Sequence, residues 1–208
     1  MMMDWATLVR KYHLPSHVTG VLHCGAHLAE EAPDYEWAFG SGVPVWWVEA
    51  NGDVFAKIDA ALKPYPNQHL LPALLADKNE DQRTFNVTNY DGMSSSILEF
   101  GTHPQFSPDT HWVRHDTMLT TTIDRLAALN GVKANMLVMD LQGAEGLVLS
   151  GAKQFLSGTD YVMSEVNRDE VYVGCAKVDE LDGFLHDFDR VETLWTPNGW
   201  GDALWVRR

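Results

Sequence analysis

Two apolar runs that end at glycine or polar residues constrain the fold of this chain more than any other feature. One run, residues 21–24, is followed by Gly25, and the other, residues 45–48, is followed by Glu49. A near-continuous apolar run of this length is typical of a parallel strand covered on both faces. Glu49 lies 24 residues after Gly25. This is close to the ~20-residue interval between a glycine turn and a ribose-binding acid in nucleotide-binding sheets. The pattern therefore predicts a bound adenosine.

Strand-like and helix-like segments alternate along the rest of the chain. Helices are expected over 5–12, 28–39, 54–62, 124–129, 144–156 and 178–188, and strands over 18–24, 43–49, 69–75, 83–88, 117–123, 135–140 and 161–166. The turn Pro197-Asn198-Gly199 between residues 191–195 and 203–207 predicts a closing antiparallel hairpin. We therefore expect an α/β, Rossmann-like fold with a mostly parallel central sheet and a C-terminal antiparallel hairpin.

The 208 residues suffice for a single domain over 18–208, preceded by a short helical extension over 1–17. Residues 89–116 are rich in Ser, Gly, Pro and His, and we expect an irregular lid or acceptor loop there.

The net charge of −14 argues against nucleic acid, because no cluster of cations is present, and favours a neutral or cationic small substrate. No apolar run approaches the ~18 residues of a membrane span, so no membrane partner is expected. Two cysteines without a Cys-x-x-Cys motif, and the lack of a secretory signal, predict a cytoplasmic protein without disulfides. The sequence leaves the oligomeric state open.

The loop after Gly25 narrows the choice of cofactor. A pyrophosphate site needs Gly-x-Gly-x-x-Gly, whereas this loop has a single glycine and places Glu30 in the first helical turn. A Walker loop is also missing. S-adenosylmethionine carries a ribose and an adenine but no phosphate, and it fits this pattern. A nicotinamide oxidoreductase on a similar sheet is the less favoured alternative.

A family resemblance supports the same cofactor. Residues Asp140-Leu141-Gln142-Gly143-Ala144-Glu145, followed by Leu149-Ser150-Gly151-Ala152, resemble the signature of FkbM-type S-adenosylmethionine-dependent methyltransferases. Further matches follow the family order, at Gly25-Ala26-His27 with Glu30-Glu31, Trp47-Val48-Glu49-Ala50-Asn51, Ser94-Ser95-Ser96, Thr120-Thr121-Thr122-Ile123-Asp124 and Glu165-Val166-Asn167. The resemblance covers roughly residues 18–206 and implies a class I methyltransferase fold. Gln142 stands where the family more often has Glu, and His27 stands where Asn is common.

Ligands of doubly wound sheets bind beyond the carboxyl ends of the strands. Together with the resemblance, this rule predicts cofactor contacts at Gly25, Ala26, His27, Glu49, Ala50, Asn51, Ala73, Leu74, Ser95, Ser96, Asp140 and Gln142. Glu49 is expected to bind the ribose hydroxyls, and Gly25 to let the backbone approach the methionine part. Ala73 and Leu74 either line the adenine site or belong to the core. His27 either donates to the cofactor carboxylate or caps the following helix.

Methyl transfer to a hydroxyl needs a group that removes the hydroxyl proton, and Asp140 is the first candidate, with Glu165 the second. The predicted function is O-methylation of a sugar or other small molecule. An alternative is a cofactor-binding scaffold that has lost turnover, motivated by Gln142. Mg²⁺ held by Asp140, Glu165 and Asn167 is possible but not favoured, and we predict no metal site.

Three further groups of residues have alternative interpretations. His103, His111 and His115 include a spacing suited to zinc, but we favour a place in the acceptor pocket or lid. Trp195, Trp200 and Trp205 either stack on a sugar or pack in the core, and the core is favoured. Glu145 is interpreted as structural, because an acid is favourable in the first turn of a helix.

Overall fold

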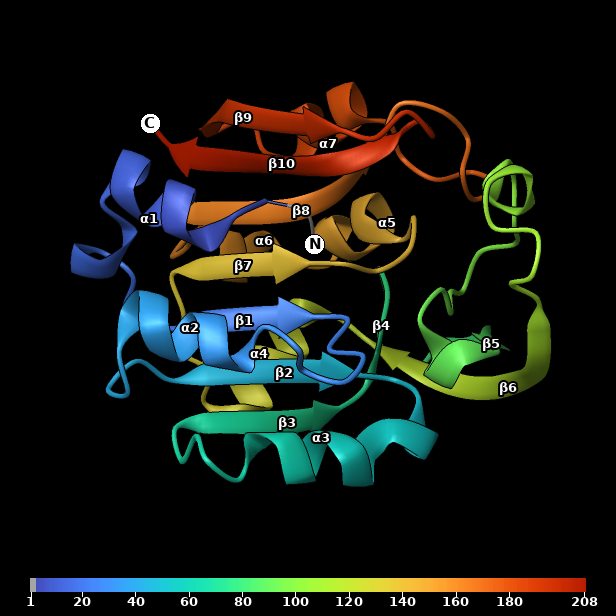
Figure 1. The fold of residues 1–208 in the computed structure, drawn as a ribbon, viewed down its shortest axis with the longest axis horizontal. Coiled ribbons are helices and arrows are strands. Elements are labelled where there is room, and N and C mark those ends of the chain that lie inside the picture. Colours follow the sequence, from blue (N-terminus) through green and yellow to red (C-terminus); the bar gives the residue numbers. More distant parts are fainter. Residues whose placement is uncertain (1–2) are drawn as a thin grey trace.

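A seven-stranded sheet forms the centre of the molecule, in a computed structural model that describes residues 3–208 (Figure 1). The strand order is β3-β2-β1-β7-β8-β10-β9. The strands are β1 (Val21–Cys24), β2 (Val45–Glu49), β3 (Gln68–Pro72), β7 (Met136–Met139), β8 (Tyr161–Asn167), β9 (Phe188–Trp195) and β10 (Trp200–Arg207). The first five strands in this order run parallel, and β10 is antiparallel to both β8 and β9. The predicted fold, a mostly parallel sheet with a C-terminal antiparallel hairpin, is confirmed.

Helices cover both faces of this sheet because successive residues of a strand point to opposite faces. On β1, Val21 packs into one core cluster and Leu22 into the other. The first cluster includes residues of α1 (Trp5–Tyr12), α2 (Ala32–Phe39) and α3 (Phe55–Leu62). The second includes residues of α4 (Ile123–Asn130), α5 (Glu145–Ser150), α6 (Lys153–Leu156) and α7 (Val178–Phe184). Short 3₁₀ turns lie at Leu14–Ser16, Gly52–Val54, Tyr90–Gly92 and His103–Gln105.

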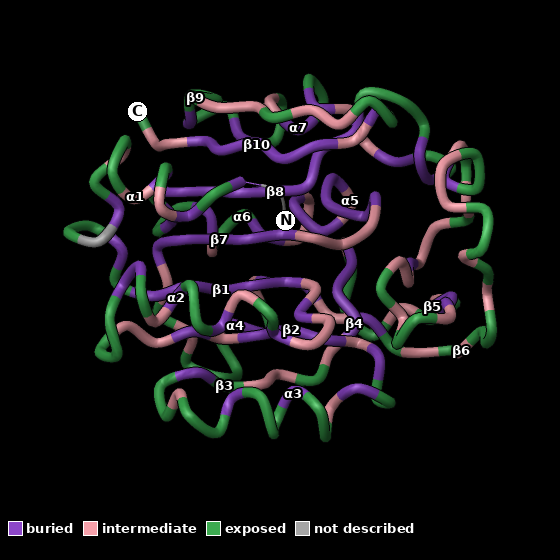
Figure 2. The backbone as a smooth tube through the Cα atoms, in the orientation of Figure 1, coloured by how far each residue is buried: buried purple, intermediate pink, exposed green. Residues whose placement is uncertain are grey.

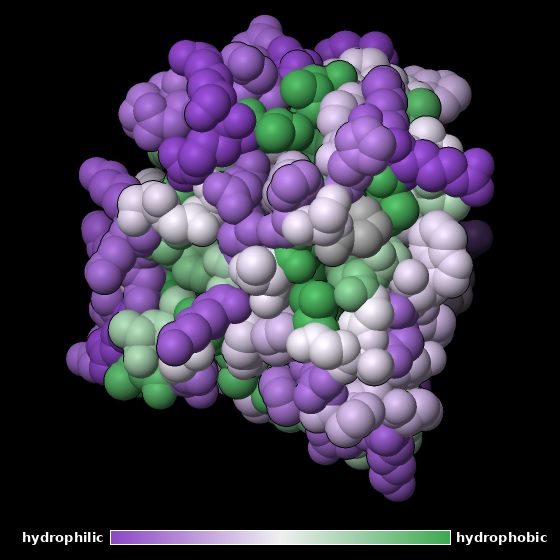
Figure 3. Space-filling model, turned by 90° about the vertical axis from the view of Figure 1, so that its left-hand side faces the viewer, coloured by the Kyte–Doolittle hydropathy of each residue, from purple (hydrophilic) through white to green (hydrophobic). Residues whose placement is uncertain are grey.

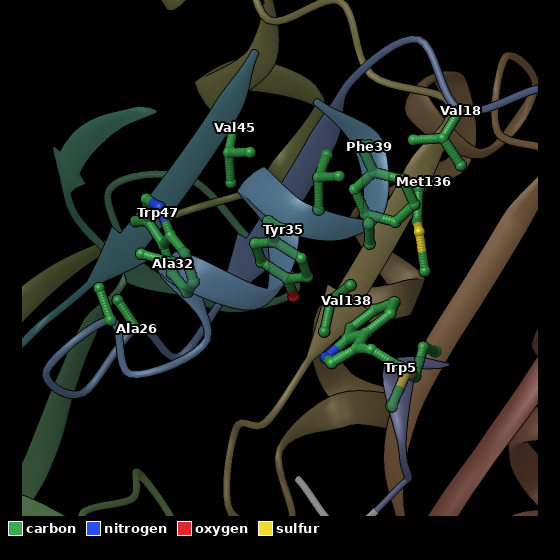
Figure 4. Packing of buried hydrophobic residues seen from close by; sticks show 14 of the residues in the cluster. Trp5, Val18, Ala26, Ala32, Tyr35, Phe39, Val45, Trp47, Met136 and Val138 are labelled. Atoms are coloured by element: carbon green, nitrogen blue, oxygen red, sulfur yellow. The ribbon is translucent and has the colours of Figure 1, made fainter. Parts of the chain in front are cut away.

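The N-terminal helix α1 contributes directly to the first core cluster (Figure 4). Its Trp5 ring is 5% exposed and lies edge-on to Tyr35 and Phe39 of α2, at centroid distances of 5.0 and 5.8 Å. Edge-to-face aromatic pairs add to the free energy gained from burying their area. Residues 1–17 were expected as an extension before the domain, and residues 1 and 2 lie outside the described residues. Met3, Leu8 and Leu14 of this segment also belong to the cluster, so it packs against the same sheet as the rest of the chain.

A second, smaller sheet has the order β4-β6-β5, with β4 (Leu74–Leu75), β5 (Gln82–Thr88) and β6 (Trp112–Thr121). We expected residues 69–75 to form one strand, and this was wrong. The chain leaves the large sheet after β3, and β4 pairs instead with Thr120 and Thr121 of β6. In Figure 1 the small sheet lies beyond the carboxyl ends of β1, β2 and β7, toward which their arrowheads point.

Two other expected elements differ from the structure. Residues 89–116 were expected to be irregular, but β6 begins at Trp112. Residues 144–156 were expected to form one helix, but α5 ends at Ser150 and α6 begins at Lys153. The interruption lies at Gly151, where a Cβ atom would be 2.9 Å from the Thr122 Cγ2 atom. The segment that contains Thr122 therefore approaches the helix closely at this point.

Element boundaries shift at two helices as well. Helix α2 begins at Ala32 rather than at residue 28, because His27 and Ala29 have positive φ values of 45° and 56° and form a turn. Helix α7 ends at Phe184 rather than at residue 188, because Phe188 is the first residue of β9.

Burial is deepest in the middle of the large sheet (Figure 2). All residues of β1, β7 and β8 are buried, whereas most residues of the edge strands β3 and β9 are half-buried or exposed. Figure 3 shows the side that carries the amino ends of the parallel strands, where hydrophilic and hydrophobic side chains are interspersed. Within residues 3–208, no helix has the length and apolar character needed to cross a membrane.

Candidate functional site

A cavity of about 640 Å³ opens at the carboxyl ends of the parallel strands. It is lined by the ends of β1, β2, β7 and β8 and by segments of residues 91–97, 103–107 and 171–172. Every residue that we predicted to contact a cofactor or to act in catalysis lies on its wall, namely Gly25, Ala26, His27, Glu49, Ala50, Asn51, Ala73, Leu74, Ser95, Ser96, Asp140, Gln142 and Glu165. The roles assigned to these residues remain predictions, but the structure brings them to one place.

Gly25 allows the ends of β1 and β7 to meet at the floor of the cavity. Its φ of +90° is in the region that favours glycine, and a Cβ atom at this position would lie 1.9 Å from the Asp140 carbonyl oxygen. The Asp140 N–H donates to the Cys24 carbonyl oxygen at 2.9 Å. Only glycine permits this approach, which leaves backbone rather than a side chain facing the cavity.

The Glu49 carboxylate is held rigidly at the end of β2. Its Oε2 atom accepts from the His27 N–H at 2.8 Å, and its Oε1 atom accepts from the N–H groups of Ala50 and Asn51 at 2.9 and 2.7 Å. Burial raises the pKa of Glu49, and these three donors oppose that rise. A carboxylate has about four acceptor sites, so one site on Oε2 is left for a hydroxyl in the cavity.

His27 lies beside Glu49 and presents an unused ring nitrogen. Its Nδ1 atom is 2.7 Å from the Glu30 Oε1 atom, and this hydrogen bond is the main reason why the pKa of His27 is raised. Among the described residues, the buried Nε2 atom has no hydrogen-bond partner. The raised pKa favours the cationic form of the ring, and that form suits a ligand carboxylate. The alternative that His27 caps α2 is wrong, because the cap of that helix lies at Glu31.

An apolar compartment lies next to Glu49, where β2 faces the small sheet. Leu74 and Phe85 are buried there, and Ala50 and Ile97 pack against them. All four residues line the cavity. Phe85 and Ile97 were missed in the sequence analysis, although Phe85 lies within the strand expected over 83–88. The compartment suits a flat, apolar ring such as adenine.

Two carboxyl groups, those of Asp140 and Glu165, lie side by side at the carboxyl ends of the neighbouring strands β7 and β8. Met139 pairs with Ser164, so the next residue of each strand lies at the same level of the sheet edge. Burial raises the pKa of Glu165 well above its usual value, and the negative charges of Asp140 and Glu145 add to this effect. Burial and the neighbouring charges thus favour the neutral form of Glu165, which lies beside the partly exposed Asp140.

Glu145 supports the loop that connects Asp140 to α5. It is 2% exposed, and its Oε1 atom accepts from the N–H groups of Leu141 and Gly143 at 2.8 and 3.4 Å. Burial raises the pKa of Glu145 to about 7. Glu145 is the first residue of α5 and does not line the cavity, which agrees with a structural interpretation.

The serine segment orders the loop over the cavity. The Ser96 Oγ–H donates to the Gln142 carbonyl oxygen at 2.8 Å, and the Ser95 Oγ atom accepts from the Thr88 N–H at 3.1 Å. Ser94 lies 3.3 Å from the His103 Nε2 atom through its hydroxyl group. These contacts account for the serines as loop-ordering residues, and a direct contact with a cofactor stays a prediction.

The far rim of the cavity is built by two segments that are distant in sequence. The Gly101 N–H donates to the Val171 carbonyl oxygen at 2.9 Å, and the Val173 N–H donates to the Glu99 carbonyl oxygen at 2.8 Å. We call these residues, 98–106 and 167–175, the paired rim segments. They carry an aromatic group formed by Phe100, His103, Phe106 and Tyr172, with centroid distances of 4.5–5.8 Å. This end suits the acceptor rather than the cofactor.

The histidines considered for zinc do not come together. His103 lines the cavity, whereas His111 and His115 do not, and the His115 Nδ1 atom instead lies 2.7 Å from the Asn86 Oδ1 atom. Within residues 3–208, no group of three or more His, Cys, Asp or Glu residues is arranged to hold a metal ion. Asn167 is fully buried and does not line the cavity beside Asp140 and Glu165.

The three C-terminal tryptophans also separate. Trp200 lines the cavity. Trp205 is 1% exposed, and its indole N–H donates to the Asp182 Oδ1 atom at 2.8 Å. Trp195 packs against the second core cluster. Core packing therefore accounts for Trp195 and Trp205. Of the three tryptophans, Trp200 alone lies where it could stack on a ligand.

The electrostatic character of the cavity follows from its carboxyl groups. Its lining includes Glu30, Glu31, Glu49, Asp91, Asp140 and Glu165, and no lysine or arginine among the described residues. Such a wall repels phosphate groups and attracts cations. It therefore disfavours a pyrophosphate cofactor.

Comparison with known families agrees with this geometry. A family model described as Methyltransferase FkbM domain matches residues 23–191. The chain belongs to the FkbM methyltransferase family. The 2-O-methyltransferase NoeI of Sinorhizobium fredii is 28% identical to this FkbM chain over 154 residues, which are 68% of this chain and 60% of NoeI. The chain thus spans less than two thirds of that relative's length.

Solved structures show the same fold. Methyltransferase FkbM from Methylobacillus flagellatus aligns with 90% of this chain and 43% of its own, with a TM-score of 0.55 and 13% identity. A SAM-dependent methyltransferase from Aquifex aeolicus aligns with 100% of this chain and 91% of its own, with a TM-score of 0.52 and 10% identity. The expectation of a Rossmann-like methyltransferase fold is confirmed.

Proposed function

We propose that this FkbM family member transfers a methyl group from S-adenosylmethionine to a hydroxyl group of a sugar or other small molecule. The observation that carries the proposal is that the fixed Glu49 carboxylate and the Asp140–Glu165 pair line the same cavity. Membership of a methyltransferase family supports the reaction class. The name of NoeI, a 2-O-methyltransferase, supports an oxygen acceptor.

The cavity residues fit S-adenosylmethionine in three places. Glu49 would accept from a ribose hydroxyl through its remaining site on Oε2, and the compartment with Leu74 and Phe85 would hold the adenine. The Nε2 atom of His27, which has no partner among the described residues and lies next to the backbone at Gly25, would hold the carboxylate of the methionine part. The carboxyl groups in the lining favour the positive sulfonium.

Bound S-adenosylmethionine supplies a methyl group that is activated by the sulfonium charge. Asp140 would accept the proton of the acceptor hydroxyl while that oxygen bonds to the methyl carbon and the bond from carbon to sulfur breaks. Because burial raises the pKa of Glu165 and favours its neutral form, Asp140 would be the base of the pair. The paired rim segments would hold the acceptor in line with that bond and exclude water.

Calorimetric titration with S-adenosylhomocysteine tests the cofactor assignment without a known acceptor. We expect micromolar binding to the wild type, weakened about tenfold or more in Glu49→Ala, which is the scale of a lost hydrogen bond to a charged group. Glu36→Ala is the matched control, because Glu36 lies on α2 and does not line the cavity. A wild-type protein that does not bind S-adenosylhomocysteine would refute the proposal.

The acceptor step is tested with radiolabelled S-adenosylmethionine and a panel of neutral glycosides, amino sugars and uronic acids. With any acceptor that is methylated, Asp140→Asn should lower kcat about 100-fold or more, while binding of S-adenosylhomocysteine persists. An Asp140→Asn variant with wild-type kcat would show that Asp140 is not the base. Cofactor binding without any methylated acceptor would favour the alternative of a binding protein that has lost turnover.

A further inference from the structure

The Asp140–Glu165 pair places two acidic groups side by side in a largely buried site. Glu165 is 7% exposed, and strand register puts it level with Asp140. On the other side of Glu165, Asp202 of β10 lies at the directly paired position. Acidic groups this close repel one another whenever more than one is charged. A neutral donor between them would hold their oxygens in fixed positions.

The side-chain amide of Gln142 lies between the two acids. Its Nε2 atom is 2.5 Å from the Asp140 Oδ1 atom and 3.3 Å from the Glu165 Oε2 atom. An amide nitrogen carries two hydrogens, so this one group donates to both acids at once. It joins them without adding a charge.

The direction of this amide is fixed by Tyr172. The Tyr172 hydroxyl donates to the Gln142 Oε1 atom at 2.7 Å, so the oxygen faces the tyrosine and the nitrogen faces the acids. Tyr172 is fully buried and cannot turn away into solvent. Burial raises the pKa of Tyr172 well above its usual value, so its hydroxyl remains a donor.

The backbone of Gln142 is held as tightly as its side chain. Gln142 has a φ of 53°, a strained conformation for a residue with a side chain, and Gly143 follows with a φ of 93°. The Ser96 hydroxyl donates to the Gln142 carbonyl oxygen at 2.8 Å. A Cβ atom on Gly143 would lie 2.8 Å from the Tyr172 Cβ atom, so the turn is pressed against the tyrosine that orients the amide.

We propose that Gln142 is a positioning residue, whose amide bridges Asp140 and Glu165 and holds both acids in the arrangement that faces the acceptor. This inference rests on the proposed function for what the pair does. It replaces the expected role of Gln142 as a cofactor contact, because both ends of its amide are engaged by the protein.

Side-chain amide signals in ¹H–¹⁵N spectra test the bridge directly. The Gln142 pair of signals is assigned by its loss in Gln142→Asn. We expect Asp140→Asn to shift one of the two amide proton signals and Glu165→Gln to shift the other, because each acid accepts from a different hydrogen. Glu36→Gln is the control and should leave both signals in place. If the Gln142 amide proton signals stay in place in either Asp140→Asn or Glu165→Gln, the proposed bridge does not exist.

Calorimetry with S-adenosylhomocysteine separates positioning from cofactor binding. We expect Gln142→Asn to keep the wild-type affinity within about threefold, in contrast to the loss in Glu49→Ala. If Gln142→Asn lost as much affinity as Glu49→Ala, Gln142 would be a cofactor contact and the inference would be overturned. If the wild type binds no S-adenosylhomocysteine, the proposed function fails, while the amide spectra still decide whether the bridge exists.

Discussion

Glu145 makes the stability of this protein depend on pH in a way that one substitution should remove. The side chain is 2% exposed, and burial raises its pKa from 4.5 to about 7. Because the folded pKa lies above the unfolded one, the stabilising contribution is complete below about pH 4.5 and is lost as the pH rises through about 7. The difference between the two pKa values means that about 3 kcal/mol of the free energy of unfolding is lost at higher pH.

Glu145→Gln keeps the size of the side chain and the Oε1 acceptor for the Leu141 and Gly143 N–H groups, but it cannot ionise. We therefore expect the free energy of unfolding of the variant, relative to wild type, to rise by about 2–3 kcal/mol between about pH 5 and about pH 8. In a chain of this length, such a change corresponds to roughly 5–10 °C in Tm.

Urea unfolding at a series of pH values, followed by tryptophan fluorescence, measures this difference. Glu36→Gln is the matched control, because it changes the same chemical group on α2, away from the cavity. The reasoning would be refuted by a Glu145→Gln curve that runs parallel to wild type across the whole range, since burial would then cost the ionised form nothing.

Three further substitutions test other features. Gly25→Ala puts a Cβ atom 1.9 Å from the Asp140 carbonyl oxygen, so we expect a loss of about 3 kcal/mol or more in urea unfolding and no binding of S-adenosylhomocysteine by calorimetry. Wild-type affinity in that variant would contradict the close approach. Tyr172→Phe leaves the Gln142 Oε1 atom without its donor and should cost about 1–3 kcal/mol in thermal unfolding, whereas an unchanged Tm would show the bond to be unimportant. Trp5→Ala should lose about 3–5 kcal/mol in urea unfolding, and a loss below about 1 kcal/mol would mean that α1 unfolds separately.

The strand ends of the site could be predicted from the sequence because one rule governs all of them. Parallel strands present their carboxyl ends at the same edge, so Gly25, Glu49, Asp140 and Glu165 were expected together before any contact was known. Tyr172 could not be predicted in this way, because it reaches the cavity from a loop whose course depends on tertiary contacts with residues 98–106.

The errors in the fold have similar physical causes. Strand β6 was partly missed because most of its side chains from Trp112 to Leu119 are exposed or half-buried, so the sequence lacks a clean alternation there. The break between α5 and α6 was missed because it follows from the approach of Thr122 to Gly151, which no local pattern records. Local propensity predicts elements well where one face is buried and poorly where a distant segment decides.

The paired rim segments have a consequence for how this enzyme family could diversify. Backbone N–H and C=O groups of residues 98–106 and 167–175 pair with one another, while the part of the cavity that we propose for the cofactor is built from strand ends outside both segments. Recombination that imports one segment alone would leave backbone N–H and C=O groups of the other without these partners. A change of acceptor specificity should therefore involve both paired rim segments together. The smallest chimera that we expect to fold is one that exchanges both segments.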